Sequence, residues 1–254
     1  MSLINIKFSS RVLKRSTDIN VIIPQKPISN ETGMNTSLKS ESYKTLILLH
    51  GLSDDNTCWM RRTSIERYAT EHGIAVIMPG GDRSFYTNMV YGDDFYTYIS
   101  EEVPAIAREY LPLSEKREDN FIAGLSMGGY GALKIGMKNP DRYAACAGLS
   151  SVADVELFMN KHAPDCRRLV FGDKRVPESE DLFFIAEELN KSKIKPRIFM
   201  GVGTEDFMYE ENTRLRDKFK SLDFDFTYRE SAGTHNWGFW DEYIRYVLQW
   251  MFEK

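Results

Sequence analysis

The sequence has few cysteines and no long apolar segment. Its 254 residues include three cysteines, at positions 58, 146 and 166, without C-x-x-C spacing. A sparse, odd set of this kind favours free thiols in a reducing compartment over a disulfide framework. The longest apolar runs, such as 46–49, are far shorter than the roughly 18 residues that a membrane span needs. Residues 1–14 alternate in polarity and lack the apolar stretch of a signal peptide, so we expect a strand there and a cytoplasmic protein.

The sequence also has little net charge and lacks the common motifs for binding metal ions and phosphate. The 33 Lys and Arg residues and 37 Asp and Glu residues leave a net charge of −4, and no basic cluster is longer than a pair. Nucleic acids and membranes are therefore not expected partners. The sequence holds no H-E-x-x-H pair, no calcium-binding loop and no Walker lysine. We expect neither a metal site nor a phosphate site.

The chain does contain a regular alternation of strands and helices. From residue 44 onward, short apolar runs alternate with helical periodicity, which indicates an α/β fold with a mostly parallel central sheet flanked by helices. No repeat or flexible linker divides residues 1–254, so we interpret them as one domain. A polar, exposed loop is expected at 24–42, and a short cap insertion at about 150–179. The predicted strands are 4–8, 19–23, 45–49, 74–78, 120–123, 143–149, 197–202 and 224–229, and the predicted helices are 59–71, 95–110 (with Pro104 as a kink or first-turn residue), 129–138, 181–190, 209–221 and 237–251.

The most informative segment runs from Asn120 to Gly131, NFIAGLSMGGYG. It leads from a predicted strand through G-x-S-x-G into a predicted helix, which is typical of a nucleophile elbow. In such a turn the serine is held in strained geometry, and glycines two residues to either side leave room for it. The pattern alone is weak, but its strand, helix and extra glycines make Ser126 the predicted nucleophile.

A serine hydroxyl needs a base, and a histidine base needs a carboxylate to orient it. The chain has four histidines. His72 is expected at a helix end, His50 lies upstream of the serine, and His162 falls in the insertion. Only His235 follows the last predicted strand, where the order serine, acid, histidine requires the base.

Two carboxylates compete for the role of acid. Glu205 and Asp206 both follow the strand predicted at 197–202. We prefer Asp206 because its shorter side chain can be held rigidly against the histidine, whereas Glu205 is expected to face solvent.

Acyl transfer also needs amide donors for the oxyanion. One is expected from the residue after the nucleophile, which is Met127, and one from the loop after an early strand, where Leu52 follows His50-Gly51. Met127 lies at the start of the helical segment that follows the elbow, just before the helix predicted at 129–138, so the positive end of that helix would add to its field.

Several segments resemble those of the esterase D, or putative-esterase, family of α/β hydrolases, and within it the bacterial tributyrin esterases. They are LHGLSDD at 49–55, MPGGDRSFY at 78–86, and residues 124–134, 203–207 and 233–240, within a similarity that spans about 10–254. The resemblance implies an α/β-hydrolase fold, short-chain ester hydrolysis without a cofactor, a triad of Ser126, Asp206 and His235, and Leu52 and Met127 as oxyanion donors. This family also contains S-formylglutathione hydrolases, acetylxylan and feruloyl esterases and mycolyltransferases, so the substrate stays open.

The sequence therefore favours a serine carboxylesterase that forms an acyl-enzyme with a small-molecule ester of a short acyl group. The alternatives are a carbohydrate esterase that removes acetyl or feruloyl groups from xylan-derived oligosaccharides, an S-formylglutathione hydrolase, and a binding protein that keeps the fold without turnover. Most aromatic residues near the motifs are expected in the core, and Tyr86 and Trp237 are the candidates for substrate contacts. The oligomeric state stays open, a homo-oligomer included.

Overall fold

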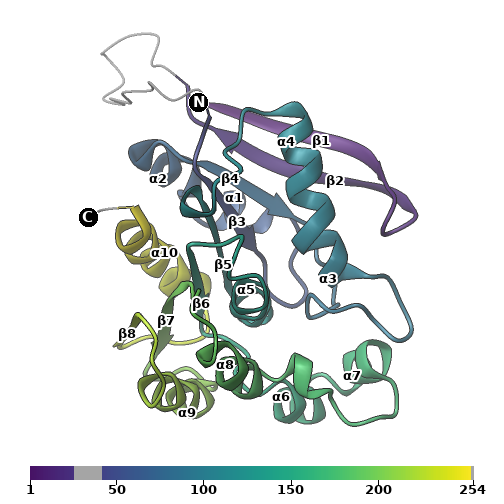
Figure 1. Cartoon of the computed structure of the whole chain (residues 1–254), viewed down its shortest axis with the longest axis vertical. Coiled ribbons are helices and arrows are strands. Elements are labelled where there is room, and N and C mark those ends of the chain that lie inside the picture. Colours follow the sequence, from purple (N-terminus) through teal and green to yellow (C-terminus); the bar gives the residue numbers. More distant parts are fainter. Residues whose placement is uncertain (26–41, 253–254) are drawn as a thin grey trace.

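The structure is a computed structural model that describes residues 1–25 and 42–252. The loop expected at 24–42 lies almost entirely outside these residues. Eight strands form one sheet in the order β1-β2-β4-β3-β5-β6-β7-β8 (Figure 1). Strand β2 runs antiparallel to β1 and β4, and every other neighbouring pair is parallel. The strands are β1 (Ser2–Ser10), β2 (Arg15–Ile23), β3 (Thr45–Leu49), β4 (Ala75–Pro79), β5 (Asn120–Leu125), β6 (Ala145–Leu149), β7 (Arg197–Gly203) and β8 (Phe226–Ser231).

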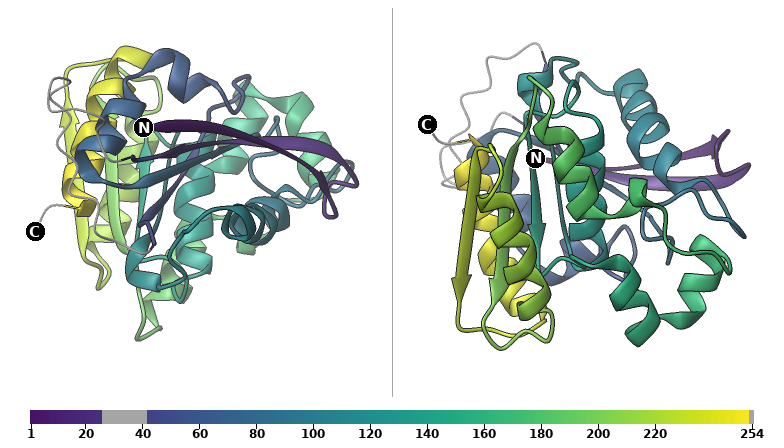
Figure 2. Two further views of the ribbon diagram at one scale, coloured as in Figure 1. Left: turned by 90° about the horizontal axis from the view of Figure 1, so that it is seen from above. Right: turned by 60° about the horizontal axis from the view of Figure 1, so that its bottom comes forward.

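Helices cover both faces of the sheet, which confirms the predicted α/β architecture (Figure 2). Successive side chains of a strand point to opposite faces. In β3, Leu46 and Leu48 belong to one core cluster, whereas Ile47 and Leu49 belong to the other. The first cluster lies under α1 (Cys58–Arg62), α2 (Ile65–His72) and α10 (Trp237–Phe252), and the second under α4 (Val103–Tyr110), α5 (Met127–Lys138), α8 (Leu182–Asn190) and α9 (Tyr209–Lys220). Burial on both faces explains why the parallel strands read as continuous apolar runs.

The helix predicted at 59–71 is wrong in one respect, because it is broken into α1 and α2. Thr63 between them is extended, and its hydroxyl donates to the Trp59 carbonyl at 2.6 Å and accepts from the Ile65 N–H at 3.1 Å. A threonine side chain that bonds to nearby main chain in this way competes with helical pairing. Apolar periodicity alone does not report that competition.

The remaining boundaries differ from the predictions by a few residues. Helix α5 begins at Met127, two residues before the predicted start at Gly129. The predicted helix 95–110 is α3 (Phe95–Thr97), a π-helical turn η2 (Tyr98–Glu102) and α4 in direct succession. Pro104 lies in the first turn of α4, directly after Val103, whose N–H donates five residues back to the Tyr98 carbonyl, so the residue without an N–H coincides with a local change to π-helical pairing. Strands predicted at 143–149 and 224–229 are β6 and β8 with later starts.

The segment at 150–179 is largely helical. It contains α6 (Val155–His162) and α7 (Pro164–Phe171), and the short helix η4 (Glu178–Glu180) follows α7. His162 is the last residue of α6. Among residues 1–25 and 42–252, no helix is both long and apolar enough to cross a membrane.

Candidate active site

Ser126 occupies a strained turn between β5 and α5. Its φ is 53° and its ψ is −118°, a conformation that costs a residue with a Cβ on the order of 1–3 kcal/mol. The Ser126 N–H donates to the Leu149 carbonyl at 2.8 Å, and its own carbonyl accepts from Tyr130 at 3.0 Å and from Val152 at 3.2 Å. The end of β6 and the first turn of α5 thus hold the serine in place.

The two glycines of G-x-S-x-G allow the main chains around the turn to approach closely. A Cβ on Gly124 would lie 2.3 Å from the Gly128 carbonyl oxygen. A Cβ on Gly128 would lie 2.5 Å from the carbonyl oxygens of both Leu49 and His50. Only glycine fits at either position, so the motif seats α5 against the ends of β5 and β3.

His235 connects Ser126 to Asp206 through hydrogen bonds. The His235 Nε2 atom lies 3.0 Å from the Ser126 Oγ, and its Nδ1 lies 2.9 Å from Asp206 Oδ2 and 3.1 Å from Oδ1. The Asp206 side chain is fully buried, and the Met208 N–H also donates to Oδ1 at 2.9 Å. With the proton on Nδ1, Nε2 is free to accept the serine proton. The structure thus brings together the three residues predicted as a triad.

Glu205 points away from this path and holds a different group. Its carboxylate accepts a hydrogen bond from the Gly233 N–H and another from the Thr204 hydroxyl at 2.8 Å. These bonds, that from Gly233 first, lower the pKa of Glu205. Of the two competing acids, only Asp206 contacts His235, while Glu205 braces the loop that carries the histidine.

The two predicted oxyanion donors flank the serine in sequence or in space. Met127 opens α5 directly after Ser126, and a Cβ on Gly51, next to Leu52, would lie 3.7 Å from the Ser126 Cβ. Within the part of the chain that the structure describes, neither the Leu52 nor the Met127 N–H donates to a protein acceptor. Both amides are therefore available to an oxyanion.

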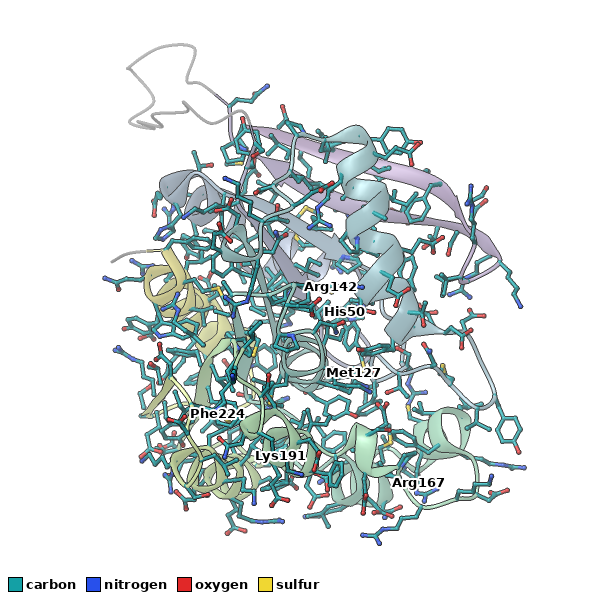
Figure 3. The ribbon with its side chains drawn as sticks, viewed as in Figure 1. His50, Met127, Arg142, Arg167, Lys191 and Phe224 are labelled. Carbon is teal, nitrogen blue, oxygen red and sulfur yellow. The ribbon has the colours of Figure 1, made fainter. Side chains whose placement is uncertain are left out.

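His50, whose place in the fold is labelled in Figure 3, fixes the loop that contains Leu52. Its Nδ1 lies 2.8 Å from the Gly51 carbonyl and its Nε2 accepts from the Gly81 N–H at 2.8 Å. This pairing suits a neutral ring with the proton on Nδ1, and burial lowers the pKa of His50 in the same sense. Tyr86 donates its hydroxyl to the His50 carbonyl at 2.8 Å and is fully buried. Its side chain thus supports the loop from within the core, and the predicted substrate contact of Tyr86 stays a prediction.

Aromatic rings surround His235, and sequence reasoning missed two of them. Trp240 meets the imidazole edge-on with ring centroids 4.8 Å apart, and Phe207 lies at the same distance with its ring inclined by 56°. Phe207 directly follows Asp206, so its position in the sequence was the available signal. Trp237 is half-buried and edge-on to Trp240 at 5.4 Å. Its substrate contact stays a prediction.

The other predicted roles can be placed as well. His72 is the last residue of α2 and precedes Gly73, whose φ of 65° ends the helix, as expected. His162 contacts Phe207 and not the triad. Among the described residues, no group of three or more His, Cys, Asp and Glu side chains is arranged to hold a metal ion.

Known proteins share the sequence and the fold of this chain. Residues 10–250 match the family described as Putative esterase. An acetyl esterase of Caldicellulosiruptor saccharolyticus is 32% identical over 264 residues, which cover 99% of this chain and 98% of that protein. The substrate-bound structure of FphF, a fluorophosphonate-binding serine hydrolase of Staphylococcus aureus, superposes with a TM-score of 0.90 at 34% identity and covers 100% of this chain and 99% of that one. The apoenzyme of the Staphylococcus aureus S-formylglutathione hydrolase FrmB gives a TM-score of 0.86 at 34% identity, with 99% of each chain covered. The fold is the α/β-hydrolase fold.

Proposed function

Because the chain belongs to the Putative esterase family and is a carboxylic ester hydrolase of the serine type, we propose that it hydrolyses short-chain acyl esters through a covalent acyl-enzyme on Ser126. The observation that carries the proposal is the path of hydrogen bonds from Ser126 Oγ through the His235 ring to the buried carboxylate of Asp206. Family membership sets aside the alternative of a binding protein without turnover.

In the acylation step, Ser126 Oγ attacks the ester carbonyl carbon while His235 Nε2 takes the hydroxyl proton. The carbonyl oxygen becomes an oxyanion, which accepts hydrogen bonds from the Leu52 and Met127 amides. Asp206 keeps the Nδ1 proton in place and stabilises the imidazolium. The bond to the alcohol then breaks, and the alcohol oxygen leaves with the proton from Nε2.

Deacylation repeats these steps with water in place of the serine. His235 takes a proton from the water, whose oxygen attacks the acyl carbon, and the same two amides hold the oxyanion. When the bond to Ser126 Oγ breaks, His235 returns the proton to the serine and the carboxylic acid is released.

The close attachment of α6 and α7 supports a preference for short acyl groups. The Val90 and Tyr91 N–H groups donate to the carbonyls of Val170 and Leu169 at 2.9 Å, which ties α7 to the loop at 88–92. In α6 the buried ring of Phe158 lies 5.9 Å from Phe85. A cap held in this way leaves less room for a long acyl chain than a broad, detached lid would. An acetyl esterase at 32% identity supports the same substrate class.

Hydrolysis of S-formylglutathione is the second candidate function. The similarity to FrmB favours it, and the formyl group is the smallest acyl group that the same triad could accept. Comparing kcat/KM on S-formylglutathione with that on p-nitrophenyl acetate separates the two functions, since a thioesterase of this kind should prefer the glutathione substrate by orders of magnitude.

The acyl-enzyme can be tested directly by stopped-flow kinetics and mass spectrometry. Mixing the enzyme with p-nitrophenyl acetate should transfer one acetyl group to the peptide that contains Ser126, and a fluorophosphonate should label the same residue. Ser126→Ala should carry neither adduct. Stoichiometric labelling of another residue would contradict the proposal.

We also propose a cytoplasmic location, which the three buried free cysteines support.

A further inference from the structure

We propose that Phe207 determines specificity by binding the alcohol portion of the ester, so that the enzyme favours aryl alcohols over small aliphatic ones. This inference rests on the proposed function, because it assumes that His235 protonates the departing alcohol. Phe207 takes no part in the triad. Its side chain is nevertheless 58% exposed, which is unusual for a phenylalanine beside buried catalytic groups.

The two rings beside His235 differ in their access to solvent. Trp240 is buried, and its indole N–H donates to the Ser150 hydroxyl at 3.2 Å, so its side of the imidazole is closed. The ring of Phe207 also lies 4.8 Å from the imidazole but is open to solvent. A substrate group next to the imidazole therefore meets Phe207 and not Trp240.

The chemistry of the reaction decides which part of the ester lies there. The carbonyl oxygen must lie at the Leu52 and Met127 amides, and the alcohol oxygen must come within hydrogen-bond reach of His235 Nε2 to receive its proton. The first carbon of the alcohol then lies roughly 4 Å from that nitrogen, given ordinary hydrogen-bond lengths. The alcohol is thus the part of the ester that is carried to the Phe207 ring.

His162 holds the Phe207 ring from the cap. The His162 ring lies 5.3 Å from Phe207 and 5.2 Å from Phe158, which is buried in the core. This row of rings keeps an exposed side chain in one position, so that it can act as a preformed surface for a planar alcohol. Aromatic pairs prefer such offset or inclined arrangements.

The test is a set of acetate esters that share one acyl group and differ in the alcohol: phenyl, naphthyl and trifluoroethyl. Wild type and Phe207→Ala are compared on each ester by kcat/KM, so the intrinsic reactivity of the leaving group cancels. We expect the variant to lose roughly three- to tenfold more activity on the two aryl acetates than on trifluoroethyl acetate. Phe207→Tyr keeps the ring and should keep the aryl preference.

A second measurement distinguishes contact with the alcohol from support of His235. The alcohol has left before deacylation, so the rate at which the acetyl-enzyme hydrolyses in single-turnover experiments should stay within about twofold of wild type in Phe207→Ala. Equal losses in acylation and deacylation would overturn the proposal, because His235 serves both steps. Equal losses on all three esters would overturn it as well.

Two further variants complete the design. Tyr110→Ala is the matched control, because Tyr110 is also a solvent-exposed aromatic, at the end of α4, and it should change no ratio. His162→Ala should reproduce part of the Phe207→Ala effect and add little to it in the double variant. Wild-type enzyme that turns over none of the esters would contradict the proposed function itself, whereas normal turnover with unchanged ratios would contradict only the role of Phe207.

Discussion

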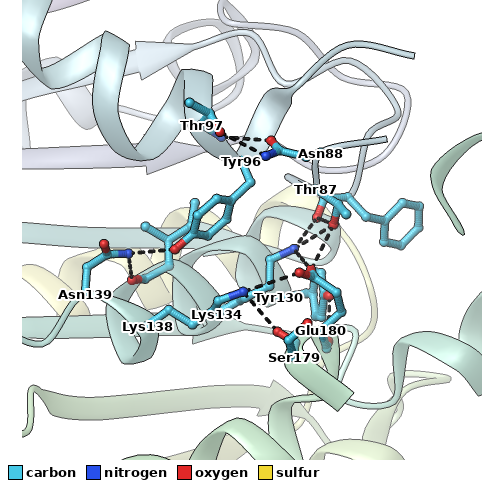
Figure 4. A network of polar contacts seen from close by, with 12 residues as sticks. Thr87, Asn88, Tyr96, Thr97, Tyr130, Lys134, Lys138, Asn139, Ser179 and Glu180 are labelled. Carbon is cyan, nitrogen blue, oxygen red and sulfur yellow. Dashed lines mark hydrogen bonds and ion pairs between the residues drawn. The ribbon is translucent and has the colours of Figure 1, made fainter. Parts of the chain in front are cut away.

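The ammonium group of Lys134 lies 2.6 Å from the Glu180 carboxylate, and the lysine side chain is completely buried (Figure 4). Lys134 belongs to α5, the helix that begins at the proposed nucleophile, and Glu180 ends η4, which follows the cap. The ammonium group also donates to the Thr87 hydroxyl at 2.6 Å and to the Phe85 carbonyl at 3.3 Å, so each of its three protons has an acceptor. One lysine thus joins α5, the loop at 85–87 and η4.

Removal of the lysine should destabilise the protein strongly. Lys134→Met would leave the Glu180 carboxylate with the Thr87 hydroxyl at 3.3 Å and, as its one nearby cation among the described residues, the ammonium group of Lys138 at 3.4 Å from the other carboxylate oxygen. We expect the free energy of unfolding in urea to fall by about 3–5 kcal/mol. Adding Glu180→Leu should restore much of the loss, because an apolar pair of similar volume is often as stable as a buried ion pair. A loss below about 1 kcal/mol would mean that the pair contributes little.

The same lysine predicts how stability depends on pH. Burial lowers the pKa of Lys134 to about 8, although Glu180 acts in the opposite direction. In the unfolded chain a lysine has a pKa of about 10.4. Between pH 8 and this value, roughly, the unfolded chain therefore binds more protons at this site than the folded chain does. The contribution of Lys134 to stability therefore rises with pH across this window and is lost as the pH falls through about 8.

That pH dependence is measured as the difference in unfolding free energy between wild type and Lys134→Met from about pH 7.5 to about pH 10.5. The free energy of unfolding of wild type, relative to that of the variant, should increase by up to about 3 kcal/mol as the pH rises across this range. A difference that is constant, or that shrinks as the pH rises, would exclude a lowered pKa for Lys134.

The triad predicts a sharp ranking of histidine variants. Ser126→Ala and His235→Ala should each lower kcat on p-nitrophenyl acetate by roughly three to six orders of magnitude, because triad members act as a unit. His162→Ala and His72→Ala should stay within about tenfold of wild type, since neither ring contacts the triad. Circular dichroism checks that all four variants fold. If His162→Ala lost as much activity as we expect of His235→Ala, the base would be His162, at the end of α6, and not His235.

The two neighbouring acids should differ just as clearly. Asp206→Asn removes the carboxylate that fixes the Nδ1 proton of His235, and a loss of roughly four orders of magnitude in kcat is typical of that change. Glu205→Gln keeps an oxygen that can accept from the Gly233 N–H, so its kcat should fall by less than about tenfold. The reverse ranking, measured on the same ester, would assign the acid to Glu205.

The site residues could be predicted because they follow strands of known order. In a parallel sheet the segments after the strands meet at the carboxyl edge, so the positions of Ser126 after β5, Asp206 after β7 and His235 after β8 carry spatial information. Gly124 and Gly128 are likewise close in sequence, and the lack of a side chain at each lets the main chain pack closely around Ser126. These features depend on spacing along the chain, which a single sequence records.

Other features depend on contacts that no local pattern encodes. Tyr86 and Phe207 are both aromatic residues beside a motif, but one is fully buried and the other exposed, and only the packing of distant loops decides between them. A lysine within a helix is typical of a solvated face, yet Lys134 is buried because Glu180, 46 positions away, meets it. Such pairs become visible only when the fold is known.

The last prediction concerns the length of the acyl chain. The interior of the cap is filled by its own buried side chains, among them Phe158, Val170 and Phe171, and α7 is tied by main-chain hydrogen bonds to the loop at 88–92. Each methylene that finds apolar cover contributes about 0.8 kcal/mol, and one that does not contributes nothing. On p-nitrophenyl esters, kcat/KM should therefore rise from acetate, reach its maximum between about two and six acyl carbons, and then fall. Movement of the cap would soften the decline without shifting the maximum to long chains. A profile that still rises at about twelve carbons would contradict the short-chain function and indicate a site of the lipase type.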